Sequence, residues 1–129
     1  MNKKLQNRIV NQSRKFYDKN GDTYQHFSFI VDRNKIISFG RSNKKKTHTF
    51  SQRQGYEYFR IHSELAAIKD FPDELIFIEE YGLSIINTRL NKKLELINSR
   101  PCLQCMKLLD FVGIRDIIYS NEKGEFEKL

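Results

Sequence analysis

Residues 100–105 read RPCLQC, and they contain both cysteines of this 129-residue chain. The two thiols stand three positions apart, directly after a proline. Pro101 fits the first position of a helix and Gly113 fits the cap after the last turn, which predicts a helix from Pro101 to about Val112. Side chains three apart on a helix share one face, and the free amides and positive dipole at a helix start stabilise thiolates. Both sulfurs can therefore hold one ion.

Helices and strands alternate around this motif. Apolar residues recur at helical spacing in Asn2–Asp18 and Ile61–Phe71, and a turn signal or a proline follows each segment. Other runs are rich in β-branched and aromatic residues, which predicts strands. The predicted strands are Tyr24–Val31, Lys35–Phe39, Leu83–Leu90, Asp116–Ser120 and Glu125–Leu129. Strands that alternate with helices indicate an α/β sandwich built on one sheet.

The connections between the strands indicate how some of them pair. Residues 32–34 join the first two strands and are typical of a hairpin. Residues 121–124 alone separate the last two strands, whereas neighbouring parallel strands need a crossover of a dozen or more residues. The last two strands, if they pair, are therefore antiparallel. Leu94–Ser99 extends or re-enters a strand, and Glu74–Tyr81 fits a strand or a helix equally well.

Length and composition fit one folded domain over residues 1–129, which buries roughly two thirds of its unfolded surface. The net charge of +7 favours anionic partners, and nucleic acid is among them. Lys44, Lys45 and Lys46 lie in the polar segment Arg41–Gly55, which we expect to be a loop; they either border a phosphate or are simply solvated.

Nothing in the sequence indicates a membrane or secretory protein. No apolar run reaches the roughly 20 residues that a membrane helix needs. Residues 1–10, MNKKLQNRIV, lack the apolar core of a secretory signal. We therefore expect no membrane partner and a cytoplasmic or otherwise intracellular location. In such a reducing compartment, a close cysteine pair is more often catalytic or metal-bound than a structural disulfide.

The other candidate metal ligands are three histidines, and His62 is the most informative of them. Two cysteines and three histidines make a closed, thiolate-rich structural zinc site hard to build. One histidine with both cysteines leaves a coordination position open for hydrolysis. Glu64 stands two residues after His62, so on a helix it points elsewhere and is not a co-ligand, but it can move protons. His26 and His48 are more typical of packing or surface positions. A thiol-redox function of the two cysteines is the alternative.

HSE at residues 62–64 and PCLQC at residues 101–105 match the H-x-E and P-C-x-x-C signature of zinc nucleobase deaminases. The sequence thus resembles the cytidine and deoxycytidylate deaminase superfamily. This resemblance implies a three-layer α-β-α fold, cytidine deaminase-like, with a five-stranded mixed sheet and the two motif helices side by side. It also implies Zn²⁺ held by His62, Cys102 and Cys105, with Glu64 as the catalytic acid and base. The protein would then be a hydrolase acting on the C–N bond of a cyclic amidine.

The resemblance leaves the substrate open. An antiparallel last strand resembles the branch that acts on free nucleosides, whereas deoxycytidylate, transfer-RNA and polynucleotide deaminases carry an intervening helix and a parallel last strand. The basic charge favours a phosphorylated or polymeric substrate instead. Cytidine, deoxycytidine, CMP and dCMP are therefore all candidates, and the alternative is nucleic-acid binding or base editing. Small deaminases of this kind suggest a homo-oligomer, a tetramer or a dimer. Candidate substrate contacts are Asn43, Ser63, Pro101 and Tyr119, and Tyr56, Tyr58 and Phe59 either stack on a base or pack internally.

Overall fold

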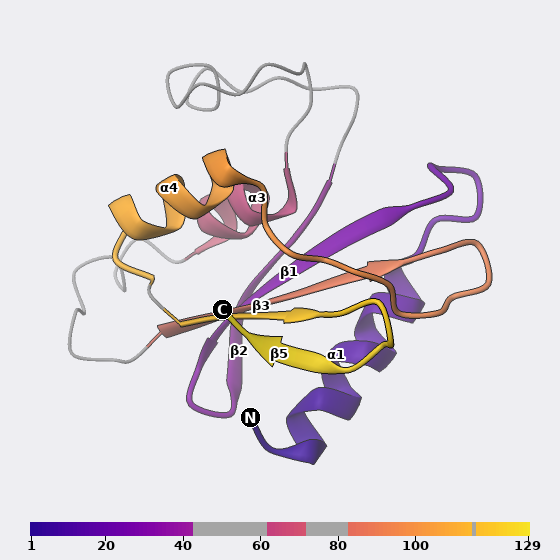
Figure 1. The fold of residues 1–129 in the computed structure, drawn as a ribbon, viewed down its shortest axis with the longest axis horizontal. Helices are drawn as coiled ribbons and strands as arrows, with labels where there is room; N and C mark the ends of the chain where they lie inside the picture. Colours follow the sequence, from indigo (N-terminus) through magenta and orange to yellow (C-terminus); the bar gives the residue numbers. More distant parts are fainter. Residues whose placement is uncertain (43–61, 72–82, 115) are drawn as a thin grey trace.

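The computed structural model describes residues 1–42, 62–71, 83–114 and 116–129, and Figure 1 shows their arrangement. Several sequence predictions lie outside these residues. They are the undecided segment Glu74–Tyr81, the part of the predicted loop after Ser42, and the residues Asn43, Lys44, Lys45, Lys46, His48, Tyr56, Tyr58 and Phe59.

Within the described residues, five strands form one sheet in the order β2-β1-β3-β4-β5. β3 and β4 are parallel, and every other neighbouring pair is antiparallel. The prediction of a five-stranded mixed sheet whose last two strands are antiparallel is therefore confirmed. The strand bounds are β1 Gln25–Asp32, β2 Lys35–Arg41, β3 Leu83–Leu90, β4 Asp116–Ser120 and β5 Phe126–Lys128.

Helices cover both faces of the sheet, which gives the three layers that the resemblance implied. α1, Lys3–Phe16, lies on one face, and α3, Ser63–Asp70, lies beside α4, Leu103–Phe111, on the other (Figure 1). Successive side chains of a strand point to opposite faces, so Ile86 packs in the α1 core and Ile85 in the α3–α4 core. No helix in the described part of the chain is both long enough and apolar enough to span a membrane.

β2 is longer than its apolar pattern predicts. The predicted strand ends at Phe39, and Arg41 was predicted to begin a loop. In the structure Gly40 pairs with Ser28 and Arg41 pairs with Phe27. Glycine and arginine give no local strand signal, so this extension depends on pairing with β1. The predicted hairpin is confirmed, because Asp32 pairs with Lys35 across two turn residues.

Both motif helices begin later than predicted. α4 starts at Leu103, and Cys102 rather than Pro101 is the residue at its boundary. Cys102 has extended backbone angles, and its sulfur accepts a hydrogen bond from the Cys105 amide at 3.4 Å, so the thiol group caps the helix. In α3 the corresponding boundary residue is His62. The helix-start prediction for Pro101 was wrong because proline also fits the position before a cap.

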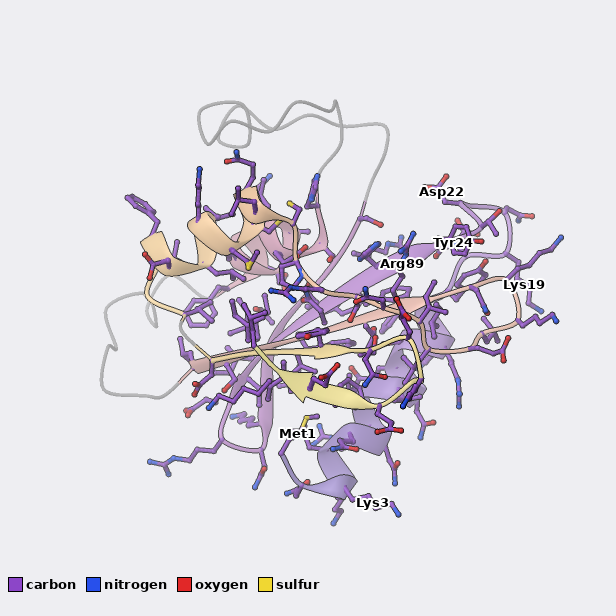
Figure 2. All side chains as sticks on the ribbon, viewed as in Figure 1. Met1, Lys3, Lys19, Asp22, Tyr24 and Arg89 are labelled. Atoms are coloured by element: carbon purple, nitrogen blue, oxygen red, sulfur yellow. The ribbon has the colours of Figure 1, made fainter. Side chains whose placement is uncertain are left out.

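Two segments next to the ends of β3 and β1 differ from their predicted strands. Leu94–Ser99 forms no strand of its own: it meets the sheet through an isolated bridge between Leu96 and Leu90 and through single backbone hydrogen bonds to β3 and β4. Tyr24 was predicted as the first residue of a strand but lies just before β1, where the Arg89 guanidinium stands 5.0 Å from the centre of its ring (Figure 2).

Candidate metal centre and active site

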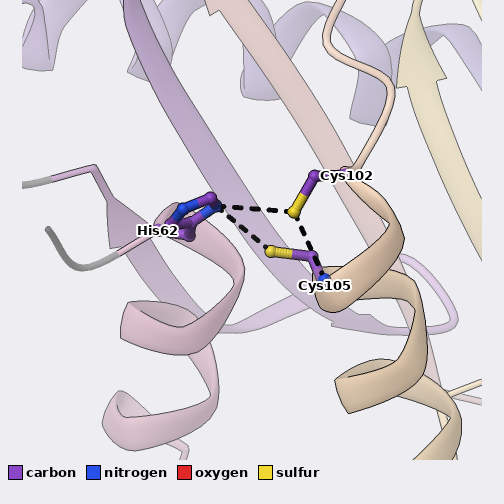
Figure 3. Close-up of side chains that lie close together, drawn as sticks. All are labelled: His62, Cys102 and Cys105. Atoms are coloured by element: carbon purple, nitrogen blue, oxygen red, sulfur yellow. Dashed lines mark hydrogen bonds between the residues drawn. The ribbon is translucent and has the colours of Figure 1, made fainter. Parts of the chain in front are cut away.

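The starts of α3 and α4 bring His62, Cys102 and Cys105 together (Figure 3). The Nδ1 atom of His62 lies 3.7 Å from the sulfur of Cys102 and 3.4 Å from that of Cys105. The three possible ligand atoms all lie within 4.8 Å of one another. Cys102 lies 40 positions after His62 in the sequence, and Cys105 lies 43 positions after it. Two distant segments therefore form one cluster.

The donor atoms of this cluster fit a zinc ion. Tetrahedral zinc with Zn–S bonds of ~2.3 Å and Zn–N bonds of ~2.0–2.1 Å places neighbouring nitrogen and sulfur ligands about 3.6 Å apart. The observed separations of 3.4 and 3.7 Å lie on either side of that value. Among the described residues, no further histidine, cysteine or carboxylate joins the group. Three protein ligands are the number typical of catalytic rather than structural zinc sites.

The electrostatic environment of Cys102 favours its thiolate. The hydrogen bond with Cys105 is the main cause that lowers the pKa of Cys102 to about 4, and the hydrogen bond with His62 acts in the same direction. A thiolate is the form in which cysteine binds metal ions. The exposed Cys102 is therefore prepared for a ligand, whereas Cys105 is buried.

Glu64 lies in the first turn of α3 and is buried, with only 4% of its surface exposed. Its Oε1 accepts a hydrogen bond from the Ser63 hydroxyl at 3.1 Å, and its Oε2 accepts one from Nδ2 of Asn87 at 3.1 Å. Burial raises the pKa of Glu64 above its ordinary value, while its backbone hydrogen bond and nearby His62 lower it. A buried carboxyl with a raised pKa beside a candidate metal site is suited to accept and return protons.

The carboxyl group of Glu64 belongs to a closed ring of hydrogen bonds, which enters at one oxygen and leaves at the other. Ser63 Oγ lies 2.8 Å from Ser28 Oγ, and the Ser28 hydroxyl donates to Oδ1 of Asn87 at 2.7 Å. Asn87 Nδ2 then returns the chain to Glu64. All four side chains are buried, at 4% exposure or less. The ring connects the start of α3 with β1 and β3.

The ring has a place for one more proton. It contains four contacts, but Ser28, Ser63 and the Asn87 Nδ2 group supply one hydrogen each. A proton on Glu64 would supply the fourth hydrogen; without it, Ser63 donates to Glu64 and the contact between Ser28 and Ser63 has no hydrogen of its own.

A second set of hydrogen bonds fixes the segment that leads into Cys102. The Ser99 hydroxyl donates to the Asn87 carbonyl at 2.8 Å and accepts from the Ser120 amide at 2.8 Å. The Ser99 amide also donates to the Ser120 carbonyl at 2.8 Å. This segment is therefore anchored to both β3 and β4 three residues before the first cysteine.

Three of the four predicted substrate contacts lie within the described residues, each in a different part of the site. Ser63 belongs to the hydrogen-bonded ring, and Pro101 is buried directly before Cys102. Tyr119 is partly buried on β4 and pairs with Asn87, so it lies on the α3–α4 face of the sheet. Asn43 lies outside the described residues.

Sequence reasoning missed Ser28, Asn87 and Ser99. The available signal was a polar residue at an inward-facing position of an apolar strand. In β3, Asn87 occupies the same face as Ile85, and in β1, Ser28 occupies the same face as Ile30. A buried polar group needs a hydrogen-bond partner, so each such position indicates a buried network.

The comparisons with known proteins identify the fold through solved structures. No family model and no curated protein matches the sequence. The dCMP deaminase of the cyanophage S-TIM5, crystallised with dCMP and dUMP, has a TM-score of 0.59 and 16% identity over 95% of this chain and 85% of its own. The cytidine deaminase of Mycobacterium leprae has a TM-score of 0.51 and 16% identity over 97% of this chain and 90% of its own. The cytidine deaminase-like fold implied by the two motifs is confirmed.

Proposed function

We propose that this protein is a zinc-dependent hydrolytic deaminase that converts a cytosine-containing nucleoside or nucleotide to its uracil form and releases ammonia. The observation that carries the proposal is the meeting of a His/Cys/Cys cluster with a buried glutamate, Glu64, at the starts of two adjacent helices. The fold, shared with a dCMP deaminase and a cytidine deaminase, supports the same reaction class.

His62, Cys102 and Cys105 would hold the ion, and their charges suit it. Two thiolates and a neutral imidazole balance the charge of Zn²⁺. When bound, zinc supplies the Lewis acidity that makes water nucleophilic at neutral pH. The anchored segment before Cys102 and the hydrogen-bonded start of α3 keep the ligands in place.

Glu64 performs the proton transfers of the reaction. It takes one proton from the attacking water and gives it to ring N3, while the water oxygen bonds to C4 of the cytosine. Glu64 then takes the second proton of that oxygen and passes it to the amino group at C4. The C4–N bond breaks, ammonia leaves and the C4 carbonyl of uracil remains. One carboxyl therefore acts as both base and acid.

The proposed substrates are cytidine, deoxycytidine, CMP and dCMP. The antiparallel pairing of β4 with β5 supports a free nucleoside, whereas the likeness to a dCMP deaminase and the charge of +7 support a monophosphate. We propose a single intracellular domain that assembles as a homodimer or homotetramer, with substrate contacts at Asn43, Ser63, Pro101 and Tyr119.

The function is tested by ammonia release from these four substrates, with zinc content measured in the same samples. Glu64→Gln keeps the shape of the side chain but removes its acid–base function, so we expect kcat to fall about 10²- to 10⁴-fold while zinc stays bound. Glu122→Gln, at an exposed turn position, is the matched control and should leave kcat unchanged. Full activity of Glu64→Gln would refute the mechanism.

Nucleic acid is the second class of candidate ligand, because the net charge is +7. Single-stranded oligonucleotides that contain cytosine should be included in the ammonia assay and in a binding assay at low salt. Salt-sensitive binding with deamination of the oligonucleotide, but not of the four small substrates, would replace the small-molecule proposal.

A further inference from the structure

The buried side chain of Asn87 makes more hydrogen bonds than a residue that only fills space in the core. It lies in the middle of β3 with 1% of its surface exposed. Its Nδ2 donates to Glu64 Oε2 at 3.1 Å and to the Ser99 carbonyl at 3.4 Å, and its Oδ1 accepts from Ser28 at 2.7 Å. The amide group therefore makes three hydrogen bonds, one of them to the proposed acid and base.

We infer that Asn87 is the positioning residue for Glu64, an inference that rests on the proposed deaminase function. The carboxyl is held from two sides, by Ser63 on its own helix and by Asn87 on the sheet. A hydroxyl beside Glu64 in the chain moves with it, whereas an amide on the central part of the sheet gives a fixed reference. Asn87 sets the direction of the carboxyl relative to the metal ligands.

The metal site itself depends little on the Asn87 side chain. Ser99 is held mainly through its hydroxyl, its amide and Ser120. Asn87 contributes its backbone carbonyl and one longer side-chain hydrogen bond, from Nδ2 to the Ser99 carbonyl at 3.4 Å. Loss of the side-chain amide should therefore disturb Glu64 while leaving the two cysteines in place. This separates a positioning role from a general structural one.

The neighbouring residue Thr88 provides a matched control. It is also fully buried, and its hydroxyl lies 2.7 Å from that of Ser13 on α1, on the opposite face of the sheet. Thr88→Val removes one buried side-chain hydrogen bond from the same strand at nearly constant shape. It removes no contact with Glu64.

The test compares Asn87→Asp, Asn87→Ala and Thr88→Val by steady-state kinetics, zinc content and thermal unfolding. The substrate is whichever of cytidine, deoxycytidine, CMP and dCMP the wild-type protein deaminates fastest. Asn87→Asp keeps the shape and the Ser28 hydrogen bond but loses the donor to Glu64 and to the Ser99 carbonyl. We expect both Asn87 variants to keep zinc and to lose about 10- to 100-fold in kcat, with KM changed less than about threefold. Thr88→Val should keep kcat within about twofold although it also loses thermal stability.

Two outcomes would overturn the inference in distinguishable ways. An active wild-type protein whose Asn87→Ala variant folds, binds zinc and retains full kcat would show that Asn87 does not position Glu64. A zinc-loaded wild-type protein that is inactive on every substrate would remove the proposed function, and the inference with it. If Asn87→Asp does not fold because two carboxylates are forced together, Asn87→Ala decides the question, since it introduces no charge.

Discussion

At the scale of single residues, Cys102 combines a structural and a chemical task. Its sulfur caps α4 by accepting the Cys105 amide at 3.4 Å, and it faces His62 across the cluster. The same contacts that stop the helix from fraying favour the charged thiolate. A thiol group that serves as a cap is therefore already in the ionisation state that a metal needs.

The low pKa of Cys102 predicts unusual reactivity in the metal-free protein. With a pKa of about 4, this thiol is ionised at pH 6, where an ordinary cysteine is almost entirely protonated. We expect iodoacetamide to label Cys102 at pH 6 after zinc is removed by a chelator, and the labelling rate to fall as pH drops toward 4. Mass spectrometry of the peptides identifies the labelled cysteine, and the buried Cys105 should react far more slowly.

Zinc is the control in the same experiment. Occupation of the site should protect Cys102, because the sulfur lone pairs then bind the metal. Rapid labelling that zinc does not suppress, or formation of a Cys102–Cys105 disulfide under mild oxidants with zinc present, would instead favour the thiol-redox alternative.

At the scale of elements, α3 owes its position to a glycine on β2. A Cβ atom on Gly40 would overlap the backbone of Ser63 and Ala67, so only glycine permits the helix to lie this close to the strand. The close approach also places Ser63 within hydrogen-bond distance of Ser28 on β1. The position of the helix and the integrity of the ring are therefore coupled.

Gly40→Ala should accordingly displace α3. We expect a loss of more than about 3 kcal/mol in unfolding free energy, or failure to fold, because the clash is with backbone and not with a movable side chain. Urea unfolding measures the effect. Gly113→Ala is the control: its φ of +87° is unfavourable for alanine, but a Cβ there meets no atom within 4 Å, so the cost should be about 1–2 kcal/mol. Equal losses for the two variants would contradict the role of Gly40.

The sequence predicted the His/Cys/Cys cluster fully but the elements and the buried network only in part. The cluster was predictable because His62, Cys102 and Cys105 stand in local motifs whose chemistry is visible in the spacing. The end of β2 was not, since Gly40 and Arg41 are strand residues only through their partners on β1. Asn87 was not either, because its partner Glu64 is 23 positions away and its role appears only when the sheet meets the helix.

At the scale of the whole molecule, the proposed metal joins two helices that contact each other only at a few points along their length. α3 packs mainly on β1 and β2, whereas α4 belongs to the connection between β3 and β4. An ion held by His62 on one side and two cysteines on the other would tie these halves together. The two described core clusters, however, contain none of the three ligands, although Cys105 is itself fully buried. The fold should therefore exist without the metal and be more stable with it.

Removal of zinc should lower the melting temperature without unfolding the protein at 25 °C. Free zinc at about 100 times its dissociation constant stabilises the folded state by about 2.7 kcal/mol, which corresponds to roughly 10 °C for a domain of this size. We expect a chelator to cause a fall of this order and added zinc to reverse it, as measured by circular dichroism. Cys102→Ser should melt near the metal-free temperature and respond little to either treatment, because serine is a poor ligand for zinc. A wild-type melting temperature that neither chelator nor zinc changes would mean that the cluster holds no tightly bound ion. Unfolding at 25 °C on chelation would mean that the two apolar cores cannot maintain the sheet without it.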